Sequence, residues 1–217
     1  RFQKPITLAG YNFAQALEPR VKYFRRSGPN KDSTFLLDTA LLPLTIESLW
    51  RDDELVGRDR RESTEWLTLG LSSRIYNLQT GKKKIEFSVG MKERFRGEEM
   101  YSQLSTLPLS YWAKRLYGSS LRWNFGSNTG FEVTRLSGGK RESVSQTRFG
   151  LEHRNGQGGL FSLAYRKGNR LSGFSSRDIE QLEFNGMFEV SRGFRPFFAI
   201  NFDFDRFRLS EGFLGLE

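Results

Sequence analysis

The sequence predicts an all-β fold, namely an antiparallel transmembrane β-barrel of which these 217 residues form about ten strands. Apolar and polar residues alternate one by one along many segments, and this is the period of a β-strand rather than of a helix. The longest of these segments also reach the roughly 9 to 11 residues that a tilted strand needs to cross a bilayer. No segment shows a convincing amphipathic helix pattern.

The alternating segments follow one another along the chain. In order, we expect strands over 13–24, a weaker one over 42–50, then 65–76, 84–95, 121–125, 146–152, 161–165, 182–190 and 198–204, with a further strand beginning at 212. The strands at 182–190 and 198–204 are joined by a short basic turn, so they are expected to form a hairpin.

Each long strand carries one apolar and one polar face. In a membrane barrel the apolar face contacts lipid and the polar face lines the lumen. The residues expected to face lipid are Leu67, Leu69, Leu71, Ile85, Phe87, Val89, Phe184, Phe198, Ile200 and Phe202. Those expected to line the lumen and contact a partner or substrate are Arg74, Lys84, Glu86, Lys92, Arg94, Arg122, Arg148, Glu152, Glu183, Asp203 and Asp205. Trp66 and Tyr76 share the polar parity, whereas Phe95 is expected in a lipid-side aromatic girdle.

The connections separate this interpretation from its alternatives. A diffusion porin or an outer-membrane enzyme barrel would show the same strands, and a soluble, basic β-sandwich would bury the same apolar face in a core. Long and short connections alternate with strand parity, which favours a transmembrane barrel: 51–64, 96–118 and 167–178 are long, and 77–83, 126–130, 154–159 and 191–195 are short. The medium connection at 137–143 is indecisive, and the exception is 25–39, which would be a long turn on the short-turn side. The Phe-rich apolar face and small polar-face residues such as Gly70 and Gly90 also favour the membrane barrel.

Composition argues against several functions. The formal net charge of +9 invites a nucleic-acid interpretation, but the basic clusters lie in expected turns and loops, so we expect no nucleic-acid partner. The one histidine, His153, has no acidic catalytic motif around it. The absence of cysteine removes disulfides and thiolate metal sites from this stretch. We therefore expect no catalytic residue, no cofactor and no metal site.

Three motifs in a fixed order give the chain a specific resemblance. They are Leu17-Glu18-Pro19-Arg20-Val21-Lys22-Tyr23, Leu49-Trp50-Arg51-Asp52-Asp53-Glu54-Leu55-Val56-Gly57-Arg58-Asp59-Arg60 and Leu67-Thr68-Leu69-Gly70-Leu71-Ser72-Ser73-Arg74-Ile75-Tyr76, and Phe87-Ser88-Val89-Gly90-Met91 continues the match. The chain resembles the barrel of the lipopolysaccharide-assembly outer-membrane protein family LptD, sharply over 17–95 and strand by strand afterwards. Trp50 replaces the family's usual Phe, and 62–65 fills a variable region.

This resemblance implies the domain organisation and the function. Residues 1–217 would be a portion of a single outer-membrane β-barrel domain, with the family's periplasmic amino-terminal domain and its final strands outside this chain. The whole protein would be a translocon that inserts lipopolysaccharide into the outer leaflet of the Gram-negative outer membrane, and it would not be an enzyme. Its expected partners are a lumen-plugging lipoprotein, lipopolysaccharide and outer-membrane lipid.

Overall fold

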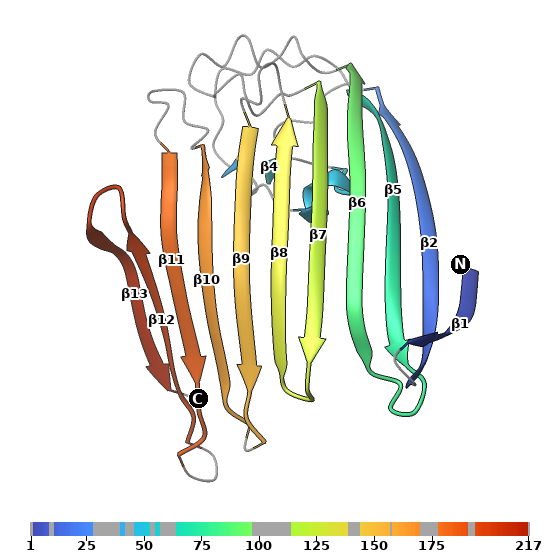
Figure 1. Ribbon diagram of the computed structural model, residues 1–217. Coiled ribbons are helices and arrows are strands. Elements are labelled where there is room, and N and C mark those ends of the chain that lie inside the picture. Colours follow the sequence, from blue (N-terminus) through green and yellow to red (C-terminus); the bar gives the residue numbers. More distant parts are fainter. Residues whose placement is uncertain are drawn as a thin grey trace, which may run out of the picture.

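The computed structural model forms one curved antiparallel sheet whose strands lie side by side in chain order (Figure 1). The structure describes residues 2–8, 11–27, 40–41, 46–52, 55–56, 64–96, 114–138, 144–156, 158–169, 178–190 and 194–216. The main sheet has eleven strands, in the order β1-β2-β5-β6-β7-β8-β9-β10-β11-β12-β13. An open antiparallel sheet of this size confirms the predicted all-β class.

Most of the predicted strands are present, but no strand was predicted over 2–8 or 129–138, and the strand predicted over 182–190 ends at 187. The strands of the main sheet are β1 (Phe2–Leu8), β2 (Tyr11–Arg26), β5 (Thr64–Asn77), β6 (Lys83–Arg96), β7 (Arg115–Phe125), β8 (Thr129–Gly138), β9 (Val144–Arg154), β10 (Leu160–Asn169), β11 (Asp178–Met187), β12 (Pro196–Asp203) and β13 (Arg208–Leu216). Between β2 and β5 the chain forms a separate ribbon, β3 (Ala40–Leu41) with β4 (Leu55–Val56), and the short 3-10 helix η1 (Ile46–Leu49). A membrane-spanning α-helix is absent from the described residues.

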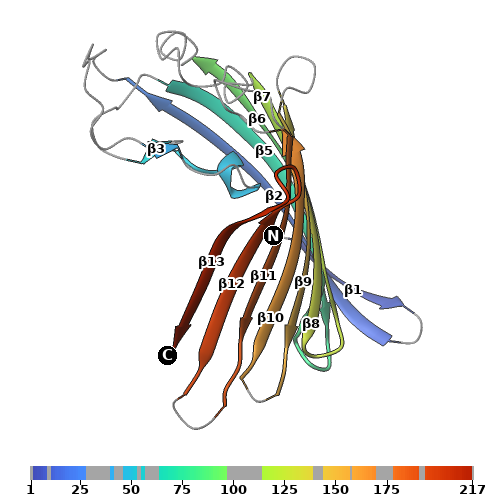
Figure 2. The same ribbon diagram turned by 90° about the vertical axis from the view of Figure 1, so that its left-hand side faces the viewer.

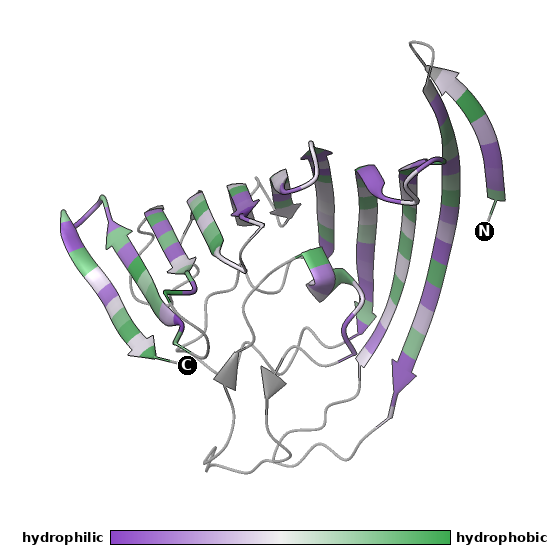
Figure 3. Cartoon of the chain, turned by 90° about the horizontal axis from the view of Figure 1, so that it is seen from below, coloured by the Kyte–Doolittle hydropathy of each residue, from purple (hydrophilic) through white to green (hydrophobic). Residues whose placement is uncertain are grey.

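The sheet curves into a trough, and η1 lies on its concave side (Figures 2 and 3). Residues directly opposite each other on neighbouring antiparallel strands point to the same face, so the register assigns each strand residue to the concave or the convex face. One convex row runs through Leu17, Ser73, Phe87, Leu121, Val133, Phe149, Tyr165, Leu182 and Phe202. All the residues predicted to face lipid lie on this convex face.

The apolar convex face is open. Phe87 is 44% exposed and Phe149 43%, and the described elements that pack on the sheet lie on its other side. The buried apolar side chains lie in η1 or on the concave face: Ala16, Leu49, Trp66, Leu136 and Ala164. A soluble sandwich packs its apolar face against a second sheet, and no such sheet exists among the described residues. An exposed apolar surface of this extent is typical of a membrane contact.

The strand expected over 42–50 is wrong. Residues 46–49 form η1, and 42–45 lie outside the described residues. β2 therefore pairs directly with β5. The expected turn over 25–39 is also wrong at its start, because residues 25 and 26 belong to β2, while 28–39 lie outside the described residues. Everything between β2 and β5 is thus one connection, and the exception to the long-and-short alternation disappears.

A strand at 2–8, which the sequence pattern did not reveal, adds β1 to the sheet and pairs it with β2. The connections from β2 to β5, β6 to β7, β8 to β9 and β10 to β11 all leave the same end of the strands, which we call the long-connection end. The turns at 78–82, 126–128 and 155–159 lie at the opposite, short-turn end. The β12–β13 turn at 204–207 is short although it lies at the long-connection end.

Candidate functional site

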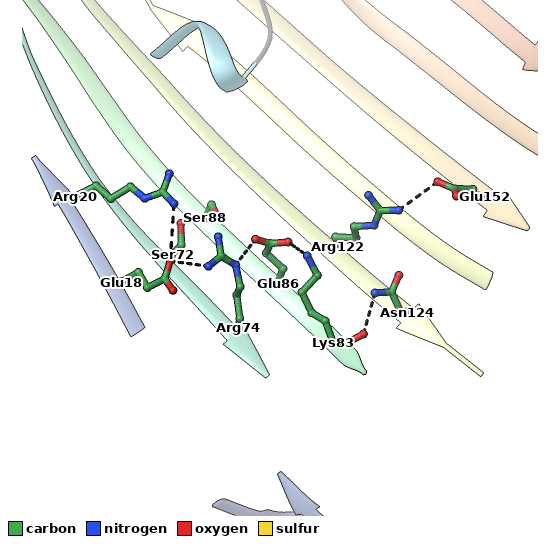
Figure 4. Close-up of polar contacts among 10 residues, drawn as sticks. All are labelled: Glu18, Arg20, Ser72, Arg74, Lys83, Glu86, Ser88, Arg122, Asn124 and Glu152. Carbon is green, nitrogen blue, oxygen red and sulfur yellow. Dashed lines mark hydrogen bonds and ion pairs between the residues drawn. The ribbon is translucent and has the colours of Figure 1, made fainter. Parts of the chain in front are cut away.

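A row of alternating charges crosses the concave face. Arg74 on β5 lies opposite Glu86 on β6, and Glu86 lies opposite Arg122 on β7 (Figure 4). Arg122 lies in turn opposite Glu132 on β8, and the row reaches Glu183 on β11. Opposite charges at facing positions stabilise a strand pair, so the alternation of sign favours this register.

Ion pairs link this row to the rows beside it. Arg74 binds Glu18 at 2.5 Å and Glu86 at 2.6 Å, and Lys83 also binds Glu86. The remaining pairs are Arg122–Glu152 at 3.2 Å, Arg148–Glu132 at 3.9 Å, Arg148–Glu183 at 3.9 Å and Arg166–Glu183 at 2.8 Å. We call these residues the charge ladder: Arg74, Lys83, Arg122, Arg148 and Arg166 with Glu18, Glu86, Glu132, Glu152 and Glu183. Because five cations face five carboxylates, the charge ladder by itself offers many polar contacts but carries no net charge.

Most residues predicted for the polar face belong to this ladder: Arg74, Glu86, Arg122, Arg148, Glu152 and Glu183. Lys84 does not. A β-bulge between Ile75 and Tyr76 shifts the register at the start of β6. As a result Lys83, not Lys84, binds Glu86. The Lys84 Nζ lies instead 3.4 Å from the backbone oxygen of Gly126, at the short-turn end.

Asp203 lies at the end of β12 with concave parity, whereas Asp205 differs from the prediction. The Asp203 Oδ1 accepts hydrogen bonds from the backbone N–H groups of Asp205 at 3.0 Å and Arg206 at 3.3 Å. Asp203 therefore closes the β12–β13 turn, which is a common role of an aspartate before a turn. Asp205 lies within that turn and not on a strand wall.

Residues 46–52, which include η1, pack on the concave face, and we call them the inward segment. They lie over three glycines in register: Gly70 on β5, Gly90 on β6 and Gly118 on β7. A Cβ at Gly118 would lie 2.7 Å from the Cδ1 of Leu49, and one at Gly90 would lie 3.1 Å from the same atom. A Cβ at Gly70 would overlap the ring of Trp50. The glycine row thus lets the inward segment approach the sheet backbone closely.

Side chains of the sheet also bind the inward segment through its backbone. Three successive carbonyl oxygens accept one hydrogen bond each: Leu49 from Thr68 Oγ1 (2.8 Å), Trp50 from Lys22 Nζ (2.9 Å) and Arg51 from Lys92 Nζ (3.3 Å). Lys22 also binds the carboxylate of Asp52. Carbonyls at the end of a helical turn lack partners within the turn and carry partial negative charge, so hydroxyl and ammonium donors stabilise them.

Trp66 lies beside both ammonium groups. Its ring centroid is 5.3 Å from the Lys22 Nζ and 4.4 Å from the Lys92 Nζ, and Phe24 stacks on it at 5.2 Å. Lys92 and Arg94 are expected to line the lumen and contact a partner or substrate, but they are only 4% and 7% exposed. Both lie on the concave face and are buried there, Lys92 beneath the inward segment.

A pocket of about 280 Å³ remains between the inward segment and the charge ladder. Glu47 and Trp50 contribute one wall, and Arg74, Glu86 and Arg122 contribute the other. Within the described ranges, no three histidine, aspartate or glutamate side chains gather in a way that could hold a metal ion. The mixture of basic and acidic groups suits water and polar side chains.

Sequence reasoning assigned no contact with the inward segment to Lys22, Thr68 or Gly118: Lys22 and Thr68 lie within the quoted motifs without a role of their own, and residue 118 was expected in the connection 96–118. The available signal was glycine at three positions of three successive strands. Gly70 and Gly90 were noted as small residues, but their alignment with Gly118 emerges only from the strand register.

The comparisons with known proteins agree with this architecture. The family model described as LPS transport system D matches residues 1–194. Similar proteins, each named LPS-assembly protein LptD, come from Thiobacillus denitrificans (23% identical, 100% of this chain and 28% of the relative), Nitrosomonas eutropha (27%, 99% and 28%) and Hahella chejuensis (28%, 88% and 23%). The chain therefore spans less than a third of the length of the curated relatives it matches.

The matched family consists of transport and assembly proteins and not of enzymes. The family model covers most of the chain, and the sheet has the one apolar and one charged face of a barrel wall. The chain belongs to the LPS transport system D family and is a segment of its outer-membrane β-barrel.

Proposed function

We propose that this chain supplies barrel wall and lumen lining to a translocon that inserts lipopolysaccharide into the outer leaflet. The convex face contacts membrane lipid, and the concave face lines the lumen. The observation that carries this proposal is the distribution of polar and apolar residues, which is the inverse of that in a soluble protein. Phe87, at 44% exposed, lies on the open convex face, whereas the charge ladder lies on the concave face.

The rest of the barrel and the periplasmic domain come from other parts of the full-length protein. Residues 1–217 are then one portion of a single barrel domain. Two facts support this: the curated relatives are more than three times as long as the stretch they share with this chain, and β1 and β13 each pair with a strand on one side only among the described residues. Lipid tolerates no unpaired strand edge, so both edges need further strands.

The lumen holds a plugging lipoprotein, and the part of the charge ladder on β7 to β11 contacts it. The inward segment covers the concave face over Gly70, Gly90 and Gly118, on β5, β6 and β7, so a partner reaches the wall beyond these positions. Arg122 and Arg148 have 38% and 31% of their side chains exposed, which leaves donors for a second protein. Mixed charges of this kind fix the register of a protein interface.

Photo-crosslinking in the full-length protein tests this function. A photoreactive residue at Arg122 or Arg148 should capture a small lipoprotein in cells, whereas one at Phe87 on the convex face should capture none. Lys92 is a poor position because it is 4% exposed. If Arg122 and Arg148 capture no protein and the purified full-length protein conducts ions freely in a planar bilayer, the chain is porin wall and the proposal is wrong.

A further inference from the structure

Three similar clusters lie on the convex face near the long-connection end. Each contains a tyrosine, a glutamate and a basic residue: Tyr23, Glu65 and Arg96; Tyr117, Glu93 and Arg115; Tyr165, Glu180 and Lys167. We call them the Tyr–Glu–basic clusters. They come from β2, β5 and β6, from β6 and β7, and from β10 and β11. The repetition on separate strands indicates a shared role.

The contacts within the clusters are alike. Tyr23 donates a hydrogen bond to Glu65 at 2.8 Å, and Tyr165 donates one to Glu180 at 2.6 Å. The same glutamates bind the basic residues, Arg96 at 3.6 Å and Lys167 at 3.8 Å.

In the cluster on β6 and β7, Glu93 binds the Nε of Arg115 at 2.9 Å, and Tyr117 lies two residues along the same face of β7. In each cluster the carboxylate therefore holds a cation beside an aromatic ring.

The clusters mark the border of the apolar surface. On β2, Tyr23 follows Val21, which is 72% exposed on the convex face. On β6, Glu93 follows Met91, and on β10, Lys167 follows Tyr165. Tyrosine with its ring in an apolar band and its hydroxyl at the border is typical of the membrane interface. The basic residues then lie at the level of the lipid headgroups.

The basic side chains can accept a further anionic partner. Arg96, Arg115 and Lys167 have 67%, 56% and 63% of their side chains exposed. The ion pairs of Arg96 and Arg115 run through Nε, and a guanidinium carries five N–H donors in all.

Among the side chains that the structure describes, this border carries more cations than carboxylates. Arg25 and Arg135 are also exposed on this face, so five described cations meet the three carboxylates of the clusters, an excess of two. The charge therefore favours an anion at this level of the wall.

The short-turn end differs. There the described convex face ends in aromatic side chains, with Trp123 and Phe125 in contact at a centroid distance of 5.4 Å. None of the described convex residues at that end forms a cluster of tyrosine, glutamate and a basic residue. The two ends of the wall thus meet chemically different surroundings.

We infer that the Tyr–Glu–basic clusters bind the phosphate groups of lipid headgroups in the leaflet at the long-connection end. Arginine and lysine donate charge-assisted hydrogen bonds to phosphate, and the glutamate orients the cation while the tyrosine fixes its depth. This inference rests on the proposed contact of the convex face with lipid. It adds a specific, phosphate-dependent contact to a surface otherwise described only as apolar.

The test uses the full-length protein with a photoreactive residue in place of Tyr117, reconstituted in phosphatidylcholine vesicles that contain diphosphoryl lipid A. The residue should capture lipid A. The double variant Arg96→Gln, Arg115→Gln should reduce this capture at least about fivefold, because it removes two charge-assisted contacts. Monophosphoryl lipid A should be captured less than the diphosphoryl form by the unaltered protein. Added inorganic phosphate should not change the capture, which separates a lipid headgroup from a free anion.

Matched controls distinguish a failure of the headgroup inference from a failure of the proposed function. The pair Arg154→Gln, Arg195→Gln removes two arginines of similar exposure, 69% and 45%, each paired with a glutamate and distant from the clusters: Arg154 lies on the concave face at the end of β9, and Arg195 precedes β12 at the short-turn end. It should leave capture at position 117 unchanged. Equal capture by both double variants, with lipid still captured from position 87, overturns the headgroup inference alone. If a photoreactive residue at Phe87 captures no lipid, the convex face does not contact lipid and the proposed function fails with it.

Discussion

Leu49 packs so closely against Gly118 that a Cβ on this glycine would lie 2.7 Å from the leucine Cδ1. Leu49 is 1% exposed although it belongs to a single turn of 3-10 helix and not to the sheet. The contact joins residues from distant parts of the chain. It lets the inward segment pack directly against the concave face.

Replacing Gly118 by leucine should therefore release the inward segment from the concave face. The new side chain would overlap Leu49, and overpacking of this kind costs about 1–3 kcal/mol. We expect this cost to exceed the free energy with which the few contacts of residues 46–52 hold the segment on the sheet. The full-length variant should show higher ion conductance than the unaltered protein in a planar bilayer. Gly150→Leu is the matched control, because a Cβ there meets mainly the flexible side chain of Arg148, at 3.2 Å. Equal conductance of the two variants would contradict this role of the glycine row.

A buried charge should distinguish the two faces of β5. Leu69→Arg places a cation on the apolar convex face and should destabilise the folded barrel by roughly 2–4 kcal/mol if the position lies near the bilayer midplane. Ser72→Arg lies three residues away on the concave face and should cost far less. The free energy of unfolding in lipid vesicles measures both. Equal costs would refute the assignment of the faces.

A partly buried ion pair of the charge ladder should contribute more to stability than an exposed ion pair at its edge. Arg74 and Glu86 bind at 2.6 Å with side chains 21% and 20% exposed. A double-mutant cycle with alanine should give a coupling of about 1–2 kcal/mol. The matched pair Arg154 and Glu152 binds at 2.8 Å, but Arg154 is 69% exposed, so its coupling should stay below about 0.5 kcal/mol. A coupling of the same size in both pairs would show that burial does not set their strength.

The two ends of the strands should lie on opposite sides of the membrane. Thr80 lies in the β5–β6 turn and Asp205 in the β12–β13 turn, and the chain contains no cysteine of its own. In intact cells a membrane-impermeant maleimide should label Asp205→Cys but not Thr80→Cys, measured against the unaltered full-length protein. Breaching the outer membrane should expose Thr80→Cys. Labelling of Thr80→Cys alone in intact cells would reverse the orientation.

The same approach extends to the connections outside the described residues. The sequence places 57 and 105–108 at the long-connection end and 79–82 at the short-turn end. Of these, only 79–82 lie within the described residues, where they form part of the β5–β6 turn. Protease sites inserted at 57 or 105–108 are predicted to be cut in intact cells, and a site at 79–82 only after the outer membrane is breached.

The sequence alone determined which side chains share a face. Successive residues of a strand point to opposite sides, so the alternation assigned Leu69, Phe87 and Ile200 to one face and Arg74, Glu86 and Glu183 to the other without knowledge of the partners of each strand. The motifs beginning at Leu17 and Leu67 also carried the family resemblance. These properties depend on neighbours in sequence, which a periodic pattern records directly.

The tertiary structure alone decided which polar residues remain accessible. Whether Lys83 or Lys84 binds Glu86 depends on a bulge against β5, and whether Lys92 is open depends on where residues 46–52 pack. The residues 42–50 carry a weak strand pattern, yet the three glycines on β5, β6 and β7 give η1 a surface that it approaches closely. Each of these outcomes rests on contacts between residues far apart in the chain. The free energy of burying surface in such contacts overrides the local periodicity, and the surface that is buried exists only once the sheet has formed.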